Sequence, residues 1–125
     1  MEAPERIDAG DLPRVAEGAE FVPAEDLGEI PNVVVDGALL PSTVLSLSHW
    51  PHSGTPAALR ADTSALIVER YLACDARGPE VAAVTNNHYD EDGLLGIWLL
   101  LERPPEDAPQ RRLAVAAAEA GDFGT

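Results

Sequence analysis

The hydrophobic pattern divides the chain into short apolar runs separated by polar breaks rich in proline and glycine. Short runs rich in β-branched and apolar residues are typical of buried strands and occur at residues 32–37, 43–48 and 81–86. Longer segments with apolar residues at helical spacing predict helices over about 62–74, 93–102 and 109–120. Strands that alternate with helices favour an α/β fold, with a small, largely parallel sheet and helices on its faces.

The N-terminal part of the chain lacks this pattern. Residues 1–30 are acidic and contain scattered proline and glycine, so we expect them to form a poorly ordered arm. Residues 31–125 would then form the α/β domain. Three strands are fewer than the roughly four to six of a typical sheet. We therefore expect a partial domain, truncated at its C-terminus, or a domain that completes its sheet by association.

One predicted helix is apolar on almost every side. Its residues 94–101 include leucine, isoleucine and tryptophan but no charged side chain. A helix of this kind is buried between layers of its own domain or covered by a partner. The sequence therefore predicts a homo-oligomer or a protein partner that binds through this helix.

Charge narrows the classes of function. The chain has a net charge of −14, from 22 acidic and 8 basic residues, and every basic residue is arginine. The absence of lysine excludes Schiff-base chemistry and a P-loop lysine. An acidic chain without a basic stripe is not expected to bind duplex nucleic acid. A small phosphorylated substrate is compatible with this charge if a metal ion supplies the positive charge.

The hydrophobic pattern predicts neither a transmembrane helix nor a secretory signal. No apolar run is long enough for a transmembrane helix, and the acidic N-terminus has no apolar segment of a secretory signal. The single cysteine, Cys74, falls in a predicted helix and is expected to be a small core residue. Together these features predict a cytoplasmic protein that does not bind membranes.

The clearest chemical motif follows the third predicted strand. His88, Asp90 and Asp92 stand at every second position, and alternate side chains of an extended backbone point to one face. Carboxylates suit hard divalent cations, and an imidazole widens the choice to Mn, Fe or Zn. The alternative is structural: Asp92 caps a helix, Asp90 lies in a solvated turn and His88 is a hydrogen-bonded core residue.

The other two histidines, His49 and His52, lie in the loop after the second predicted strand. In open α/β sheets the ligand site lies outside the carboxyl ends of the strands, so either histidine can face the motif there. We predict them as catalytic residues that donate a proton or contact a phosphate. The alternative is a loop that packs Trp50 over the core. Asp36 also follows a strand and is a further candidate metal ligand, although Asp-Gly pairs more commonly form turns.

The run from His88 to Gly93 (His-Tyr-Asp-Glu-Asp-Gly) resembles the first motif of the DHH phosphoesterase superfamily, His-x-Asp-x-Asp-Gly between a strand and a helix. Residues 33–37 and 47–51 are also similar to an uncharacterised bacterial family that carries this motif. The resemblance implies a parallel α/β domain with two Mn²⁺ ions, held by His88, Asp90 and Asp92. The Asp-His-His triplet that names the superfamily and the Gly-rich, His-containing motif of its second domain are absent. The rest of the site would then be lost or lie beyond a truncation, or His49, His52 and Asp36 would take its place.

These features together predict a metal-dependent, Mn-type phosphoesterase-like domain. It would hydrolyse a small phosphodiester or phosphoanhydride with metal-activated water, and Mg²⁺ or Zn²⁺ are the alternative cofactors. A second hypothesis is a non-catalytic α/β module that binds a metal, a nucleotide or a protein partner. A third is an unrelated metal hydrolase in which His49 and His52 are the primary ligands.

Overall fold

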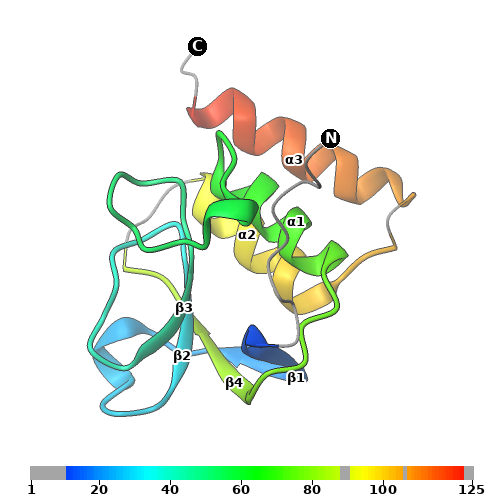
Figure 1. The fold of residues 1–125 in the computed structure, drawn as a ribbon. Coiled ribbons are helices and arrows are strands. Elements are labelled where there is room, and N and C mark those ends of the chain that lie inside the picture. Colours follow the sequence, from blue (N-terminus) through cyan, green and yellow to red (C-terminus); the bar gives the residue numbers. More distant parts are fainter. Residues whose placement is uncertain (1–10, 88–90, 106, 123–125) are drawn as a thin grey trace, which may run out of the picture.

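The computed structural model describes residues 11–87, 91–105 and 107–122. In these residues four strands and three α-helices follow one another in the order β1, β2, β3, α1, β4, α2 and α3 (Figure 1). Their bounds are β1 Arg14–Phe21, β2 Asn32–Val35, β3 Thr43–Leu47, α1 Ser64–Ala73, β4 Glu80–Thr85, α2 Glu91–Glu102 and α3 Pro109–Asp122. Two short 3₁₀ turns, η2 (Ala24–Asp26) and η3 (Ala57–Leu59), interrupt the loops.

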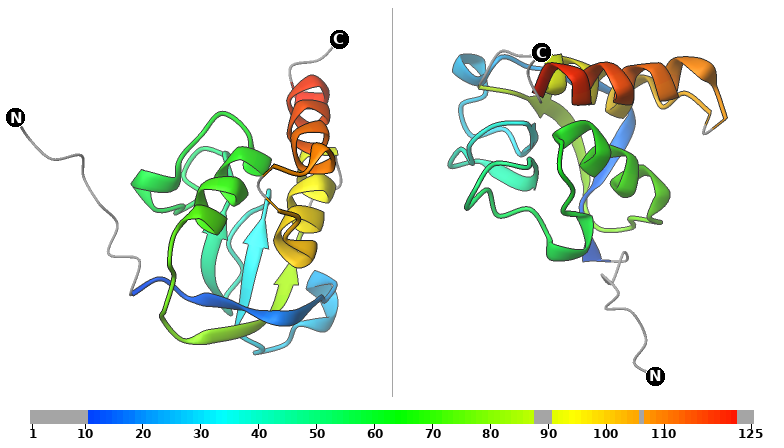
Figure 2. Two further views of the ribbon diagram at one scale, coloured as in Figure 1. Left: turned by 90° about the vertical axis from the view of Figure 1, so that its right-hand side faces the viewer. Right: turned by 90° about the horizontal axis from the view of Figure 1, so that it is seen from above.

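The strands form one sheet in the order β1-β4-β2-β3, and every neighbouring pair is parallel. This confirms the predicted small α/β fold. Helices α1 and α2 lie side by side on one face of the sheet, and α3 packs on α2 (Figures 1 and 2). The opposite face is also covered, because Val34 is fully buried beneath Gly37. Burial on both faces explains why the central strands read as continuous apolar runs.

The N-terminal segment is the main correction to the sequence analysis. Residues 14–21, predicted as part of a poorly ordered arm, form strand β1 and pair with β4, so the sheet has four strands rather than three. Two features hid this strand. It lies at the edge of the sheet and buries few side chains, so its sequence can be acidic. Its register also shifts between Val15 and Glu20, where Gly18 adopts a left-handed φ of 87°, and this shift breaks the alternation.

The predicted helices are confirmed with small changes in their bounds. Helix α1 begins after Thr63, whose side chain accepts a hydrogen bond from the Leu66 amide at 3.2 Å. A hydroxyl in this position satisfies one of the amides that the first helical turn leaves unpaired. In α2, Gly96 allows the helix to approach the sheet closely, because a Cβ atom there would lie 2.9 Å from Cγ1 of Val35.

Helix α2 is not buried on every side, contrary to the sequence analysis. Leu99 and Leu100 are fully buried in the core that α2 shares with the sheet, α1 and α3. Leu94 is instead 60% exposed. Most of the apolar surface of α2 is therefore used inside the domain, and association through this helix stays a prediction. None of the helices in the described ranges is long and apolar enough to span a membrane.

A buried tyrosine fastens the edge strand β1 to α1. The Tyr71 hydroxyl donates a hydrogen bond to the Pro13 carbonyl oxygen at 2.6 Å and accepts one from the Val15 amide at 3.0 Å. Burial raises the pKa of Tyr71 above its ordinary value of 10.0. The neutral phenol is therefore the form that the folded state stabilises.

Tyr71→Phe is expected to lower stability at neutral pH by about 1–3 kcal/mol, because the buried Val15 amide loses its acceptor. The difference from wild type should shrink as pH rises above 10.0, since the unfolded tyrosine ionises before the folded one. Urea denaturation of both proteins at neutral pH and above pH 10 measures the difference. An equal difference at both pH values would show that Tyr71 does not couple stability to pH.

Candidate metal centre

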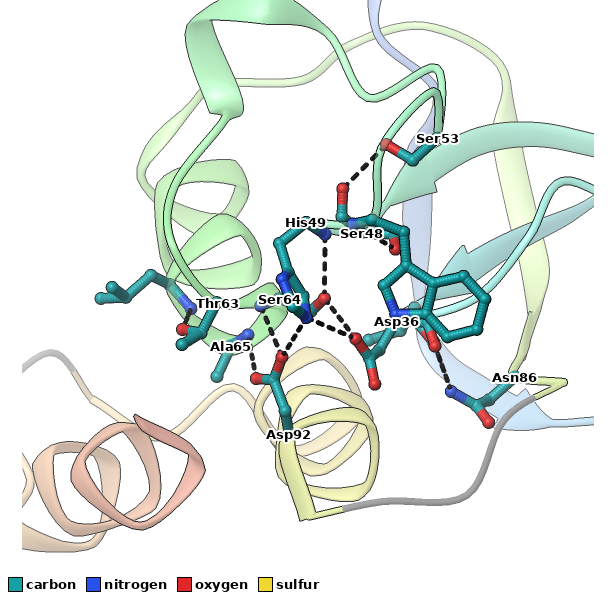
Figure 3. Close-up of polar contacts among 12 residues, drawn as sticks. Asp36, Ser48, His49, Ser53, Thr63, Ser64, Ala65, Asn86 and Asp92 are labelled. Atoms are coloured by element: carbon teal, nitrogen blue, oxygen red, sulfur yellow. Dashed lines mark hydrogen bonds and ion pairs between the residues drawn. The ribbon is translucent and has the colours of Figure 1, made fainter. Parts of the chain in front are cut away.

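Three acidic or basic side chains from separate elements meet at the carboxyl end of the sheet (Figure 3). Asp36 follows β2 directly, His49 follows β3 closely, and Asp92 lies in the first turn of α2, the helix after β4. Because the strands are parallel and β2 lies between β4 and β3, these three positions meet at the carboxyl ends of the strands. This is the place where open α/β sheets bind their ligands.

The geometry of the three side chains fits a single metal ion. Nε2 of His49 lies 3.2 Å from Oδ1 of Asp36 and 3.4 Å from Oδ2 of Asp92. One ligand atom from each residue lies within 4.8 Å of the others. Ligands about 2.0–2.2 Å from an ion lie roughly 3.0–3.5 Å apart when neighbouring bonds are perpendicular or tetrahedral. These separations are compatible with three ligands of one ion and equally with ion pairs between the imidazole and the two carboxylates.

Asp92 also binds the N-terminus of α1. Its Oδ2 accepts a hydrogen bond from the Ser64 amide at 2.7 Å, and its Oδ1 accepts one from the Ala65 amide at 2.8 Å. A carboxylate in this position is stabilised by the helix dipole. The sequence analysis offered Asp92 as a ligand on an extended segment or as the cap of its own helix. The structure places it within α2, where it caps the neighbouring helix α1 instead.

Ser64 connects Asp36 and His49 through two hydrogen bonds. Its hydroxyl donates to Oδ1 of Asp36 at 2.7 Å and accepts from the His49 amide at 3.1 Å. In the sequence, Ser64 falls only at the start of the helix predicted over about 62–74. Its role could not be seen there, because both hydrogen bonds are made with residues distant in the sequence.

The turn after β2 holds Asp36 in a special backbone conformation. Asp36 has a left-handed φ of 53°, which aspartate and asparagine tolerate better than most residues. The Asn86 side-chain amide donates to the Val35 carbonyl at 2.5 Å and to the Asp36 carbonyl at 3.2 Å. At Gly93 a Cβ atom would lie 3.1 Å from Oδ2 of Asp36 and 2.8 Å from Nδ2 of Asn86. The glycine of the predicted motif thus lets α2 approach the Asp36 carboxylate.

Burial makes the negative charges of this cluster costly. The side chains of Asp36 and Asp92 are fully buried, whereas that of His49 is 26% exposed. Two buried carboxylates are costly unless donors or a cation compensate their charge. Helix amides, the Ser64 hydroxyl and the imidazole provide part of this compensation. A divalent cation would complete it, and His49 is the member of the cluster that solvent reaches.

Buried hydroxyl groups brace the loop that carries His49. Oγ1 of Thr55 donates to the Ser46 carbonyl at 2.8 Å and accepts from the Ser48 amide at 2.9 Å. Oγ of Ser53 donates to the Ser48 carbonyl at 2.8 Å. The proline and glycine of this segment predicted a loop. The hydroxyls hold that loop in one shape, and so they fix where His49 points.

The remaining predicted site residues are His88, Asp90 and His52. His88 and Asp90 fall outside the described residues, so their role as ligands stays a prediction. The proposed extended geometry of the motif is nevertheless wrong at Asp92, because α2 already begins at Glu91. His52 is exposed, has a left-handed φ of 58°, and lines a cavity beside His49 without joining the described cluster.

The chain belongs to DUF6687, a family of unknown function, whose family model matches residues 17–125. The matched region includes Asp36, His49 and Asp92. No curated protein and no solved structure shows a significant match to the chain. The geometry of the site is therefore the main evidence on function.

Proposed function

We propose that this chain is a metal-dependent phosphoesterase-like domain in which Asp36, His49 and Asp92 hold a divalent cation. The observation that supports it is the convergence of two buried carboxylates and one partly exposed imidazole at the carboxyl edge of a parallel sheet. The three residues come from separate elements, so tertiary structure and not local sequence creates the cluster.

The donor set favours a particular group of metals. Oxygen ligands suit Mg²⁺ and Mn²⁺, and an imidazole nitrogen shifts the preference toward Mn²⁺ or Zn²⁺. A bound ion of this kind acts as a Lewis acid and makes water a better nucleophile near neutral pH. The chain's own residues would fix the ion: α1 amides orient Asp92, and the Ser64 hydroxyl orients Asp36. A second ion at His88 and Asp90 is a prediction from the resemblance to DHH phosphoesterases.

A second candidate is a non-catalytic α/β module. The observation that favours it is the pairing of both Asp92 oxygens with amides of α1. Together with Ser64 and His49, Asp92 then connects the ends of β2, β3, α1 and α2 without any metal. In that case the cluster would be a structural joint, and any ligand or partner would bind elsewhere.

A hydrolysis assay separates the two candidates. The chain is treated with a chelator and assayed with bis(p-nitrophenyl) phosphate, p-nitrophenyl phosphate and pyrophosphate, with and without Mn²⁺, Mg²⁺ or Zn²⁺. We expect Mn²⁺-dependent turnover of at least one substrate and none in Asp36→Asn. No turnover of any substrate with any of the three metals would favour the non-catalytic module. Turnover that survives both chelation and Asp36→Asn would point to a contaminating enzyme.

A further inference from the structure

A cavity of about 340 Å³ lies beside the candidate metal centre. This is at the lower end of the range of small-molecule sites and too small for a polymer. His49 belongs both to the wall of the cavity and to the metal cluster. A molecule in the cavity would therefore lie against the exposed edge of a candidate metal ligand.

Arg60 supplies a positive charge to the cavity wall. Its described side-chain contact is one long hydrogen bond, 3.4 Å from Nε to the Thr55 carbonyl oxygen. A guanidinium carries five N–H donors, so most of its donor capacity is available to a ligand. The backbone beneath it is fixed, because the Arg70 guanidinium donates to the Arg60 carbonyl at 2.6 Å. In a chain of net charge −14, an arginine in a cavity is suited to an anionic group such as a phosphate.

Trp50 supplies a flat apolar surface to the same wall. Trp50 is partly buried and is one of the residues that line the cavity. The turn that carries it is closed by a hydrogen bond from the Ser53 amide to the Trp50 carbonyl at 3.2 Å. An indole face in a small cavity favours stacking with a planar ring. His52, on the exposed side of this turn, adds a polar group at the rim.

We propose that this cavity binds a small phosphorylated molecule with an aromatic part. Its phosphoryl group would lie between Arg60 and the ion held by Asp36, His49 and Asp92, and its ring would lie against Trp50. The inference rests on the proposed metal site, because two buried carboxylates would repel a phosphate in the absence of a cation.

Calorimetric titration tests this in two steps. The first step titrates Mn²⁺ alone into the metal-free chain. The second titrates phenylphosphonate and methylphosphonate, which carry the same anionic group on a C–P bond that phosphoesterases do not hydrolyse, into the Mn²⁺-loaded and metal-free proteins. We expect phenylphosphonate to bind only the Mn²⁺-loaded protein and more tightly than methylphosphonate.

Two variants and one control assign the contacts. Arg60→Gln should weaken phenylphosphonate binding by about tenfold or more and leave the Mn²⁺ affinity unchanged, because the bond lost is charge-assisted. Trp50→Leu should remove the preference for the phenyl over the methyl compound. Arg77→Gln makes the same charge change at a side chain that is 71% exposed and outside the cavity, and should behave as wild type.

The outcomes are distinguishable. Mn²⁺ binding with no phosphonate binding, or with equal phosphonate affinities in Arg60→Gln and Arg77→Gln, would overturn the inference and leave the metal site intact. A chain that binds no metal would overturn the proposed function itself, and the inference with it. Melting temperatures of the variants, measured beforehand, show whether a lost affinity reflects a lost fold.

Discussion

Replacing Leu99 with aspartate is expected to unfold the domain. Leu99 is fully inaccessible to solvent and lies in the single core cluster that joins the sheet to α1, α2 and α3. A carboxylate at this position would lose its hydration without gaining a partner, and the leucine contacts would be lost as well. The combined cost is expected to exceed about 4–5 kcal/mol, a large part of the roughly 5–15 kcal/mol that stabilises a typical domain. Circular dichroism melting and size-exclusion chromatography measure the effect.

Leu94→Asp is the matched control for this variant. It makes the same substitution on the same helix, at a side chain that is 60% exposed. We expect it to change stability by no more than about 0.5 kcal/mol. A melting temperature of Leu99→Asp equal to wild type would contradict the described core. If Leu94→Asp alone eluted with a smaller apparent mass than wild type, the exposed face of α2 would instead be where an associated chain binds.

Asp36→Asn is expected to abolish tight binding of Mn²⁺. The change removes one of two buried ligand charges, while asparagine has nearly the same size and also tolerates the left-handed φ of 53° at this position. Changes to outer partners of metal ligands typically cost about 10–100-fold in affinity, and the loss of a ligand itself should cost more. A ligand that binds only the native state raises the melting temperature, by an amount equivalent to about 2.7 kcal/mol at a concentration 100 times its Kd. Thermal titration with Mn²⁺ should therefore show a rise in wild type and none in Asp36→Asn.

The control for charge is Asp26→Asn, at an exposed aspartate in η2 outside the cluster. It should respond to Mn²⁺ as wild type does. If Asp36→Asn kept the full response, the ligand assignment would be wrong. If wild type showed no response and Asp36→Asn only lowered the melting temperature without metal, the cluster would be the structural joint of the non-catalytic alternative.

Most of the fold could be predicted from the sequence because its central elements are buried on both faces. Strands β2, β3 and β4 are short apolar runs bounded by turn residues, and this pattern is strong. Strands β1 and β3 both lie at an edge of the sheet, but β1 alone of the four contains two glutamates in its middle and end, Glu17 and Glu20, and is interrupted by the left-handed Gly18. Its place in the sheet depends on backbone pairing with β4, which side-chain patterns do not encode.

The candidate site was predicted less completely than the fold, because its contacts join residues that are distant in the sequence. Asp92 was found because it belongs to a local motif, but its partners depend on the strand order β1-β4-β2-β3, which the local pattern does not contain. His49 was expected as a proton donor or phosphate contact, and Asp36 as a further candidate ligand. The structure brings both into one cluster with Asp92. Ser64 has no local signal at all, because it acts through contacts across the fold.

The most direct measurement of the central claim is pulsed electron paramagnetic resonance of the Mn²⁺-loaded chain, which detects a nitrogen bound to the ion. His88 is itself a predicted ligand of a second ion, so each protein is measured with His88 replaced by glutamine. We predict a nitrogen coupling from an imidazole in His88→Gln that disappears when His49→Gln is added and persists when His52→Gln is added. This result would assign His49 as a ligand and separate it from the neighbouring histidine in the same loop. A nitrogen coupling that persists when both His49 and His88 are replaced, or no nitrogen coupling in His88→Gln, would contradict the metal centre formed by Asp36, His49 and Asp92.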